Sequence, residues 1–230
     1  MKNFLWLTML GILCAATPLS AQWTGTRLGP KPASAPDGNI SKDDIARTTM
    51  RSYAHCVINF NRPRVIAYLE TIPGSPEAHK ISNSLAIDKC LVSDELRFNE
   101  KLFRWTVYDD LYNTSYRNFD VTKILTVPET DFASLANAIG STGSEAIAVW
   151  QLGECSVRAA PNEAATLVKS AIGSKIESAA INAIVPHVGG CVDKDSQIKF
   201  SKLVLRGIMA EALYKMAKKS DATFSTKGSN

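Results

Sequence analysis

The chain has 230 residues, of which 26 are Lys or Arg, 22 are Asp or Glu and 3 are His. Hydrophobic residues make up 45% and charged residues 21%, which is typical of a globular protein and excludes collagen-like, disordered and multi-span membrane proteins. The formal net charge of +4 is too small to indicate binding to nucleic acid, so we expect no nucleic-acid partner.

Residues 1–21 have the pattern of a cleaved secretory signal peptide. Lys2 supplies a positive start, 4–16 form an apolar run, and the small residues Ser20 and Ala21 offer a cleavage site. The apolar run is short for a membrane span, so we expect no integral span after cleavage. The sequence therefore predicts a periplasmic or secreted protein.

Cleavage of the signal would remove one of the five cysteines. The even number left in an exported protein predicts disulfide bonds, and four cysteines allow three pairings. Zinc ligands usually occur in pairs a few residues apart, which these cysteines do not, so we predict neither a metal nor a cofactor. The cysteines left after cleavage are Cys56, Cys90, Cys155 and Cys191.

The rest of the chain predicts an all-α fold behind a flexible tether. The tether, 22–40, is rich in proline and glycine. Helix start signals follow it at Ser41, Ser75, Thr142 and Ser174. The predicted helices, in chain order, are 42–59, 63–72, 76–90, 94–116, 130–139, 144–159, 161–172, 174–187 and 196–218.

Three local patterns complete the expected elements. The best strand-like alternation, 121–127, is short and leaves the all-α prediction in place. Pro186 should end or kink its helix, and Gly189 with Gly190 should form the turn that follows. Residues 220–230 are polar without apolar periodicity, which predicts a disordered tail.

An internal repeat is also indicated by the sequence. The cysteines fall into two pairs with nearly equal spacing, and the pattern P-x-x-x-A-x-L begins at Pro63 after the first cysteine and at Pro161 after the third. Residues 98–112 resemble 200–214 without a gap. These matches occur in the same order, so we expect the chain to have arisen by duplication.

The repeat predicts an architecture. Two disulfide-stapled units of about four helices each, 41–116 and 143–219, would be joined by a connector, 117–142, and would form a compact pseudo-twofold bundle. Among the three possible pairings of the cysteines, duplication selects the two within the units. The expected disulfides are therefore Cys56–Cys90 and Cys155–Cys191.

Both repeats place an acid on an apolar helix face, at Asp109 and Glu211. A buried acid needs a partner, and Arg104 or Arg206 of the other unit would supply one across the pseudo-dyad. A paired-carboxylate catalytic site and a ligand-binding cleft are the alternatives to this ion pair. Gly207 lies in the same segment and indicates close approach of another backbone at Trp105. The candidate ligand-binding residues are therefore Asp109, Glu211, Arg104, Arg206 and Trp105.

No catalytic signature is present. The sequence contains no H-E-x-x-H, G-x-S-x-G, phosphate-loop or dinucleotide motif. His55 and His187 lie near cysteines, but a Cys–His nucleophile requires a free thiolate, which disulfide bonding would remove. We therefore assign no catalytic residue.

The closing segment carries a resemblance. Its sequence Leu-Arg-Gly-Ile-Met-Ala-Glu-Ala-Leu-Tyr, 205–214, together with the paired cysteines, resembles a group of functionally uncharacterised exported proteins of Gram-negative bacteria. Trp105 replaces the glycine of this motif in the first repeat. The resemblance implies a periplasmic all-α protein and implies no activity.

Three classes of function stay open at this point. The favoured one is a non-catalytic periplasmic interaction or scaffold module, with a protein or peptide partner bound in a groove between helices. The alternative is a small-molecule or lipid-binding protein with an apolar cavity between helices. A hydrolase-type enzyme is the third. The oligomeric state is not predicted.

Overall fold

The computed structural model describes residues 41–91, 99–192 and 200–227, so the expected signal peptide and tether lie outside the described residues. All regular elements in these ranges are helices, and none of their residues is in a strand, which confirms the all-α fold class. Within the same ranges, no helix combines the length and the apolar character that a membrane span requires.

Eight α-helices and three short 3₁₀-helices (η) occur in the described residues. In chain order they are α1 (Lys42–Glu70), α2 (Pro76–Asn83), η1 (Asp88–Cys90), α3 (Glu100–Ser115), η2 (Val121–Thr126), α4 (Phe132–Ile139), η3 (Ser141–Gly143), α5 (Ser144–Ala159), α6 (Pro161–Lys169), α7 (Lys175–Gly190) and α8 (Lys202–Lys227).

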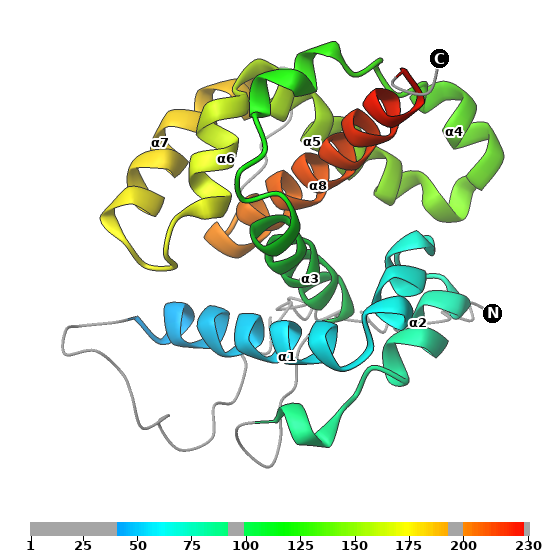
Figure 1. Cartoon of the computed structure of the whole chain (residues 1–230), viewed down its shortest axis with the longest axis vertical. Coiled ribbons are helices and arrows are strands. Elements are labelled where there is room, and N and C mark those ends of the chain that lie inside the picture. Colours follow the sequence, from blue (N-terminus) through cyan, green and yellow to red (C-terminus); the bar gives the residue numbers. More distant parts are fainter. Residues whose placement is uncertain (1–40, 92–98, 193–199, 228–230) are drawn as a thin grey trace, which may run out of the picture.

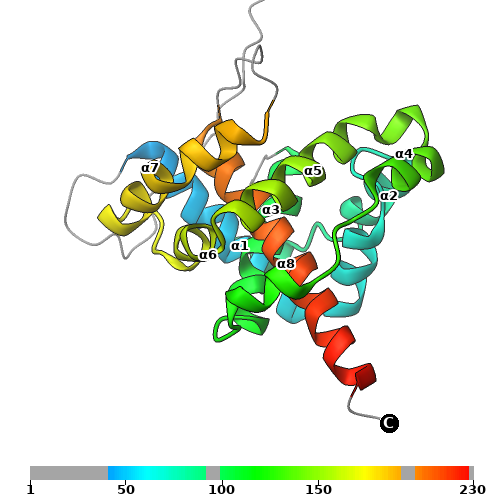
Figure 2. The same ribbon diagram turned by 90° about the horizontal axis from the view of Figure 1, so that it is seen from above.

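Helices α3 and α8 form the centre of the molecule and pack against each other more extensively than any other pair (Figure 1). Their middle turns, 106–113 and 205–214, are buried on every side, which is typical of helices at the centre of a bundle. Around them, α1 and α2 lie below α3 in the view of Figure 1, and α5, α6 and α7 lie above it. Figure 2 shows α6 and α7 on one side of α8 and α4 on the other. The two long helices that were expected to close the repeats therefore share one core.

Helix α1 joins two predicted helices through a kink. Asn61 has a non-helical backbone (φ −151°, ψ 65°), and its side chain accepts a hydrogen bond from the N–H of Arg64 at 3.2 Å, which starts a new helical segment beside Pro63. Ala160 has nearly the same backbone angles (φ −147°, ψ 66°) at the junction of α5 and α6, before Pro161. The same break thus follows Cys56 and Cys155.

The predicted helix 76–90 was too long. Helix α2 ends at Asn83, and only Asp88–Cys90 is helical again, as a single 3₁₀ turn. The hydroxyl of Tyr53 donates to the carbonyl of Leu85 and accepts from the N–H of Ile87, both at 3.1 Å. These tertiary hydrogen bonds take the backbone groups that a continuous helix would have used.

Two other local patterns differ from the observed backbone. The strand-like alternation of 121–127 forms η2, because the Asp120 side chain accepts from the N–H of Thr122 and caps a helical turn. The N-cap residue of α5 is Gly143, one residue after the predicted helix start at Thr142. The caps expected at Ser41, Ser75 and Ser174 are confirmed by hydrogen bonds to their side chains.

Two helices continue past their predicted ends. Helix α7 passes through Pro186 to Gly190, so Gly189 and Gly190 are helical and the cysteine follows directly. Helix α8 runs to Lys227, so the expected disordered tail, 220–230, begins inside a helix. Ser220 is only 1% exposed, which shows that packing of α8 extends beyond the apolar segment visible in the sequence.

Both expected disulfides are present. The sulfur atoms lie 2.09 Å apart in Cys56–Cys90 and 2.05 Å apart in Cys155–Cys191, with sequence separations of 34 and 36 residues. The first ties α1 to η1 and the second ties α5 to the end of α7. The cysteine pairing predicted from the repeat is therefore confirmed, and it excludes a free thiolate for Cys–His chemistry at these positions.

Candidate functional site

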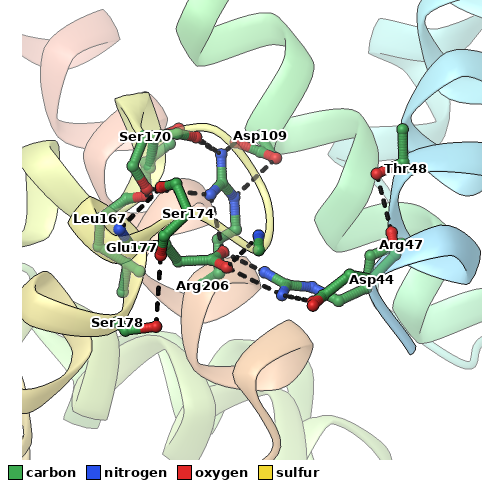
Figure 3. Close-up of polar contacts among 12 residues, drawn as sticks. Asp44, Arg47, Thr48, Asp109, Leu167, Ser170, Ser174, Glu177, Ser178 and Arg206 are labelled. Atoms are coloured by element: carbon green, nitrogen blue, oxygen red, sulfur yellow. Dashed lines mark hydrogen bonds and ion pairs between the residues drawn. The ribbon is translucent and has the colours of Figure 1, made fainter. Parts of the chain in front are cut away.

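A buried cluster of charges joins α3, α7 and α8, and Arg206 lies at its centre (Figure 3). Its Nε donates to Oδ2 of Asp109 at 3.0 Å, and its Nη1 donates to Oε1 of Glu177 at 3.0 Å. Its Nη2 donates to the carbonyls of Val168 and Ser170, at the end of α6. The ion pair between the repeats that the sequence predicted for Arg206 and Asp109 is thus present.

Helix α1 completes this cluster. Arg47 binds both carboxylate oxygens of Glu177 and also donates to Oδ1 of Asp44 at 2.9 Å. Burial alone would raise the pKa of Glu177, but hydrogen bonds from Arg47 and from the N–H of Gly173, with the charges of Arg47 and Arg206, lower it below the ordinary value. Glu177 is therefore held as a carboxylate.

The cluster is a structural element. Arg206 and Asp109 are 2% and 4% exposed, and the cavity beside them measures only about 10 Å³. Arg51 lies at the edge, with Nε 3.9 Å from Oδ2 of Asp109. The acids and arginines neutralise one another and leave no room for a ligand, so this half of the predicted site links α1, α3, α7 and α8.

Arg104 behaves differently from Arg206. It was expected to reach Glu211, but its Nη atoms donate to the carbonyls of Tyr68, Leu69 and Thr71, at the carboxyl end of α1. The guanidinium thereby satisfies carbonyl groups that a helix end leaves without partners. The predicted pair of Arg104 with Glu211 is therefore wrong.

Glu211 is held instead by two indoles and a lysine. Nε1 of Trp105 donates to Oε2 at 3.1 Å, and Nε1 of Trp150 donates to Oε1 at 2.6 Å. Nζ of Lys215 donates to Oε1 at 2.7 Å and lies 3.8 Å from the centre of the Trp150 ring. Burial lowers the pKa of the Lys215 ammonium, while Glu211 opposes this change.

An apolar cleft of about 440 Å³ opens beside this acid, between α4, α5 and α8. Glu211 and Trp150 form part of its wall, and three lysines of α8 border it: Lys215, Lys218 and Lys219. The apolar side chains that line it are Phe132, Leu135, Val149, Ile208, Ala212 and Met216. A concave apolar surface with few polar groups is the usual form of a small-molecule site.

Helix α4 forms one wall of the cleft and is not covered by the rest of the described protein. The helix is largely apolar, yet none of its residues is buried. Phe132 and Leu135 line the cleft, and Ala133 is exposed. Because an apolar helix normally buries one face, the inner face of α4 is suited to contact with an apolar molecule.

Sequence reasoning placed Asp109, Arg206 and Trp105 correctly but missed several residues. Glu177 belongs to the helix start signal at Ser174, which predicts a cap and no ion pair, and no sequence pattern distinguishes Arg47, Trp150 and Lys215 from packing residues. No signal in the chain indicated the cleft, because its wall comes from α4, in the expected connector, and from α5 and α8 of the second unit.

Two of the three histidines pair with acids away from the cleft. Nδ1 of His55 lies 3.1 Å from Oδ2 of Asp110, and Nδ1 of His79 lies 2.5 Å from Oε2 of Glu100. In the described ranges, no three His, Cys, Asp or Glu side chains are grouped to hold a metal ion. No protein family, curated protein or solved structure matches this chain.

Proposed function

We propose that this protein binds a small amphipathic molecule in the cleft between α4, α5 and α8. The observation that carries the proposal is an apolar cavity of about 440 Å³ with the buried carboxylate of Glu211 in its wall. This volume lies within the range of small-molecule sites, roughly 300–1,000 Å³. The function is that of a carrier or sensor, without a chemical step.

The lysines on α8 favour a ligand with an anionic end. Lys215 is paired with Glu211, Lys218 lies 3.6 Å from a carboxylate oxygen of Glu70, and Lys219 donates to the hydroxyl of Thr130 at 2.6 Å. The last two lysines are exposed at the rim of the cleft, so their ammonium groups remain in reach of a ligand's anionic end. An apolar tail in the cleft would bury hydrocarbon surface, at about 25 cal/mol per Å², and leave its carboxylate near the lysines. A fatty-acid-like carboxylate combines both features.

A first test uses decanoate and two charge variants of α4. Leu135→Glu places a carboxylate in the apolar wall, and Ala133→Glu places the same charge on an exposed position of the same helix. We expect the wild type and the Ala133→Glu control to bind decanoate with equal affinity. The affinity of Leu135→Glu for decanoate should be lower by a factor of at least about ten. Equal affinity in all three proteins, measured by calorimetry, would contradict the proposal.

A second test identifies the natural occupant by native mass spectrometry of the protein recovered from its own cell envelope. A small, discrete mass excess would support a ligand carrier. A protein-sized excess would instead support the interaction or scaffold module that the sequence favoured. A protein that carries neither, and that does not bind decanoate, would exclude both.

We further infer that the two halves arose by duplication and that the protein is exported to the periplasm. Equivalent features support duplication: the backbone break at Asn61 and Ala160, and positive φ angles of 77° and 76° at Gly74 and Gly173. The two disulfides are compatible with an oxidising compartment. Export is tested by measuring the mass of the protein in the cell-envelope fraction, which should correspond to a chain that begins at Gln22.

A further inference from the structure

Arg104 and Arg206 are equivalent in the two halves and cap equivalent helix ends. Arg206 donates to the carbonyls of Val168 and Ser170 at the end of α6, and Arg104 donates to those of Leu69 and Thr71 at the end of α1. Both arginines are 2% exposed. The two guanidinium groups therefore lie in similar backbone settings, and their remaining contacts can be compared.

The comparison shows what Arg104 lacks. Nε of Arg206 donates to Asp109, but Nε of Arg104 is buried without a hydrogen-bond partner among the described residues. Glu211, which corresponds to Asp109 in the gap-free alignment of the two helices, is turned to Trp105, Trp150 and Lys215. A buried N–H of a charged group without an acceptor is costly.

The second acid of the Arg206 cluster is also missing at Arg104. Glu177 is the third residue after the cap Ser174, and Ala78 stands at the same place after the cap Ser75. Ala78 is fully buried in α2 and carries no charge. In the described part of the chain, Arg104 therefore has no carboxylate within ion-pair distance.

A cavity of about 210 Å³ lies beside Arg104, where the Arg206 cluster is almost closed. Its lining includes Lys101 and Trp105 from α3, Ala146 and Trp150 from α5, and Glu211 from α8. Arg47, which fills the equivalent position of the other half, precedes Cys56 by as many residues as Ala146 precedes Cys155. The small side chain of Ala146 thus leaves space that Arg47 occupies in its own half.

Among the described charged residues that line this cavity, Arg104 has no carboxylate counter-ion. Lys101 is paired with Glu145 at 2.6 Å, and Glu211 is paired with Lys215 at 2.7 Å. We propose that the cavity binds a small aromatic monocarboxylate, whose oxygen accepts from Arg104 as the carboxylate of Asp109 accepts from Arg206. The indoles of Trp105 and Trp150 provide aromatic surface for a planar ring.

The proposal is tested with benzoate and its neutral isostere benzamide on the full, oxidised chain. We expect one benzoate to bind per chain and to quench tryptophan fluorescence. The affinity for benzamide should be lower by a factor of at least about ten, because benzamide lacks the negative charge that pairs with Arg104. Failure of benzoate to bind, or equal affinity for the two compounds, would overturn the proposal.

Two substitutions on α5 separate this cavity from the large cleft. Ala146→Leu fills the cavity and should weaken benzoate binding at least about tenfold, whereas Ala148→Leu, at an exposed position, should leave it unchanged. Leu135→Glu in the large cleft should also leave benzoate binding unchanged. Undiminished binding by a folded Ala146→Leu protein, or loss of binding in Leu135→Glu, would overturn the assignment to this cavity.

A further variant supplies the missing acid from within the chain. Ala78→Glu introduces at Arg104 the carboxylate that Glu177 provides at Arg206, and the added charge should exclude benzoate without lowering the melting temperature. If Ala78→Glu folds and still binds benzoate with the wild-type affinity, Arg104 is not the group that recognises the carboxylate. If Ala78→Glu does not fold, the comparison of benzoate binding by Ala146→Leu and Ala148→Leu tests the proposed site.

Discussion

Gly207 lies against Trp105 so closely that a Cβ atom built on the glycine would be 2.4 Å from Cβ of the tryptophan. The contact joins α8 to α3, where the two helices of the core cross. Glycine lowers helix stability by roughly 1 kcal/mol relative to alanine, so its presence in α8 requires a compensating contact. The indole of Trp105, which also donates to Glu211, provides that contact.

The first prediction concerns this crossing. Gly207→Ala should lower the free energy of unfolding by about 1–3 kcal/mol, because the new methyl group overlaps Trp105 and the helices must separate. Gly189→Ala is the matched control, since it also lies in a helix and meets nothing within 4 Å. Urea denaturation should show that the control is as stable as the wild type or more stable.

The second prediction concerns the ion pair between the halves. Asp109→Asn should lower the free energy of unfolding by about 3–5 kcal/mol, because the buried Arg206 loses one of its two carboxylate partners and keeps only Glu177, which it shares with Arg47. Asp43→Asn, at an exposed position of α1, should change it by less than about 0.5 kcal/mol. Equal effects of the two substitutions in thermal unfolding would show that the pair is not a main link between the halves.

The third prediction concerns the loss of stability at low pH. The pKa of Glu177 is lowered in the folded protein, so this group stabilises the fold above its ordinary pKa of 4.5, and the contribution is lost as the pH falls below that value. Unfolding measured from about pH 6 to about pH 3 should therefore show a smaller decrease in stability for Glu177→Gln than for the wild type. Glu145→Gln, whose side chain is 75% exposed, should keep the wild-type slope.

The fourth prediction concerns the disulfides. Removing Cys56–Cys90 by double substitution to serine should lower the free energy of unfolding by about 4 kcal/mol, because the unfolded chain regains the freedom of a closed loop. Removing Cys155–Cys191, which closes a loop of similar length, should have a similar effect. A loss below about 1 kcal/mol in either variant would show that its half does not depend on the covalent link.

The repeat pattern predicted more of this molecule than any local signal. Equivalent spacing of the cysteines gave the correct disulfides, and the alignment of the long helices placed Arg206 beside Asp109 and Gly207 beside Trp105. These contacts are predictable because they lie where α3 and α8 pack against each other. A buried acid on one helix requires a basic partner on the other, and a bulky side chain on one requires a small residue on the other.

The alignment failed where the halves differ in a small number of buried side chains. Glu211 does not meet Arg104, since Trp150 and Lys215 supply its donors and Ala78 leaves the arginine without an acid. Such differences depend on side chains from a third helix, which a comparison of two helices does not include. The end of α2 was missed for a related reason, because Tyr53 of another helix binds the backbone after it.

The order of the bridges along the chain bears on how the protein is made. Among the four cysteines of the described residues, each native disulfide joins neighbours in sequence, the first to the second and the third to the fourth. An oxidant that links cysteines in their order of emergence during synthesis would produce the native pairing directly. Maturation of this chain would therefore require an oxidase but no disulfide isomerase.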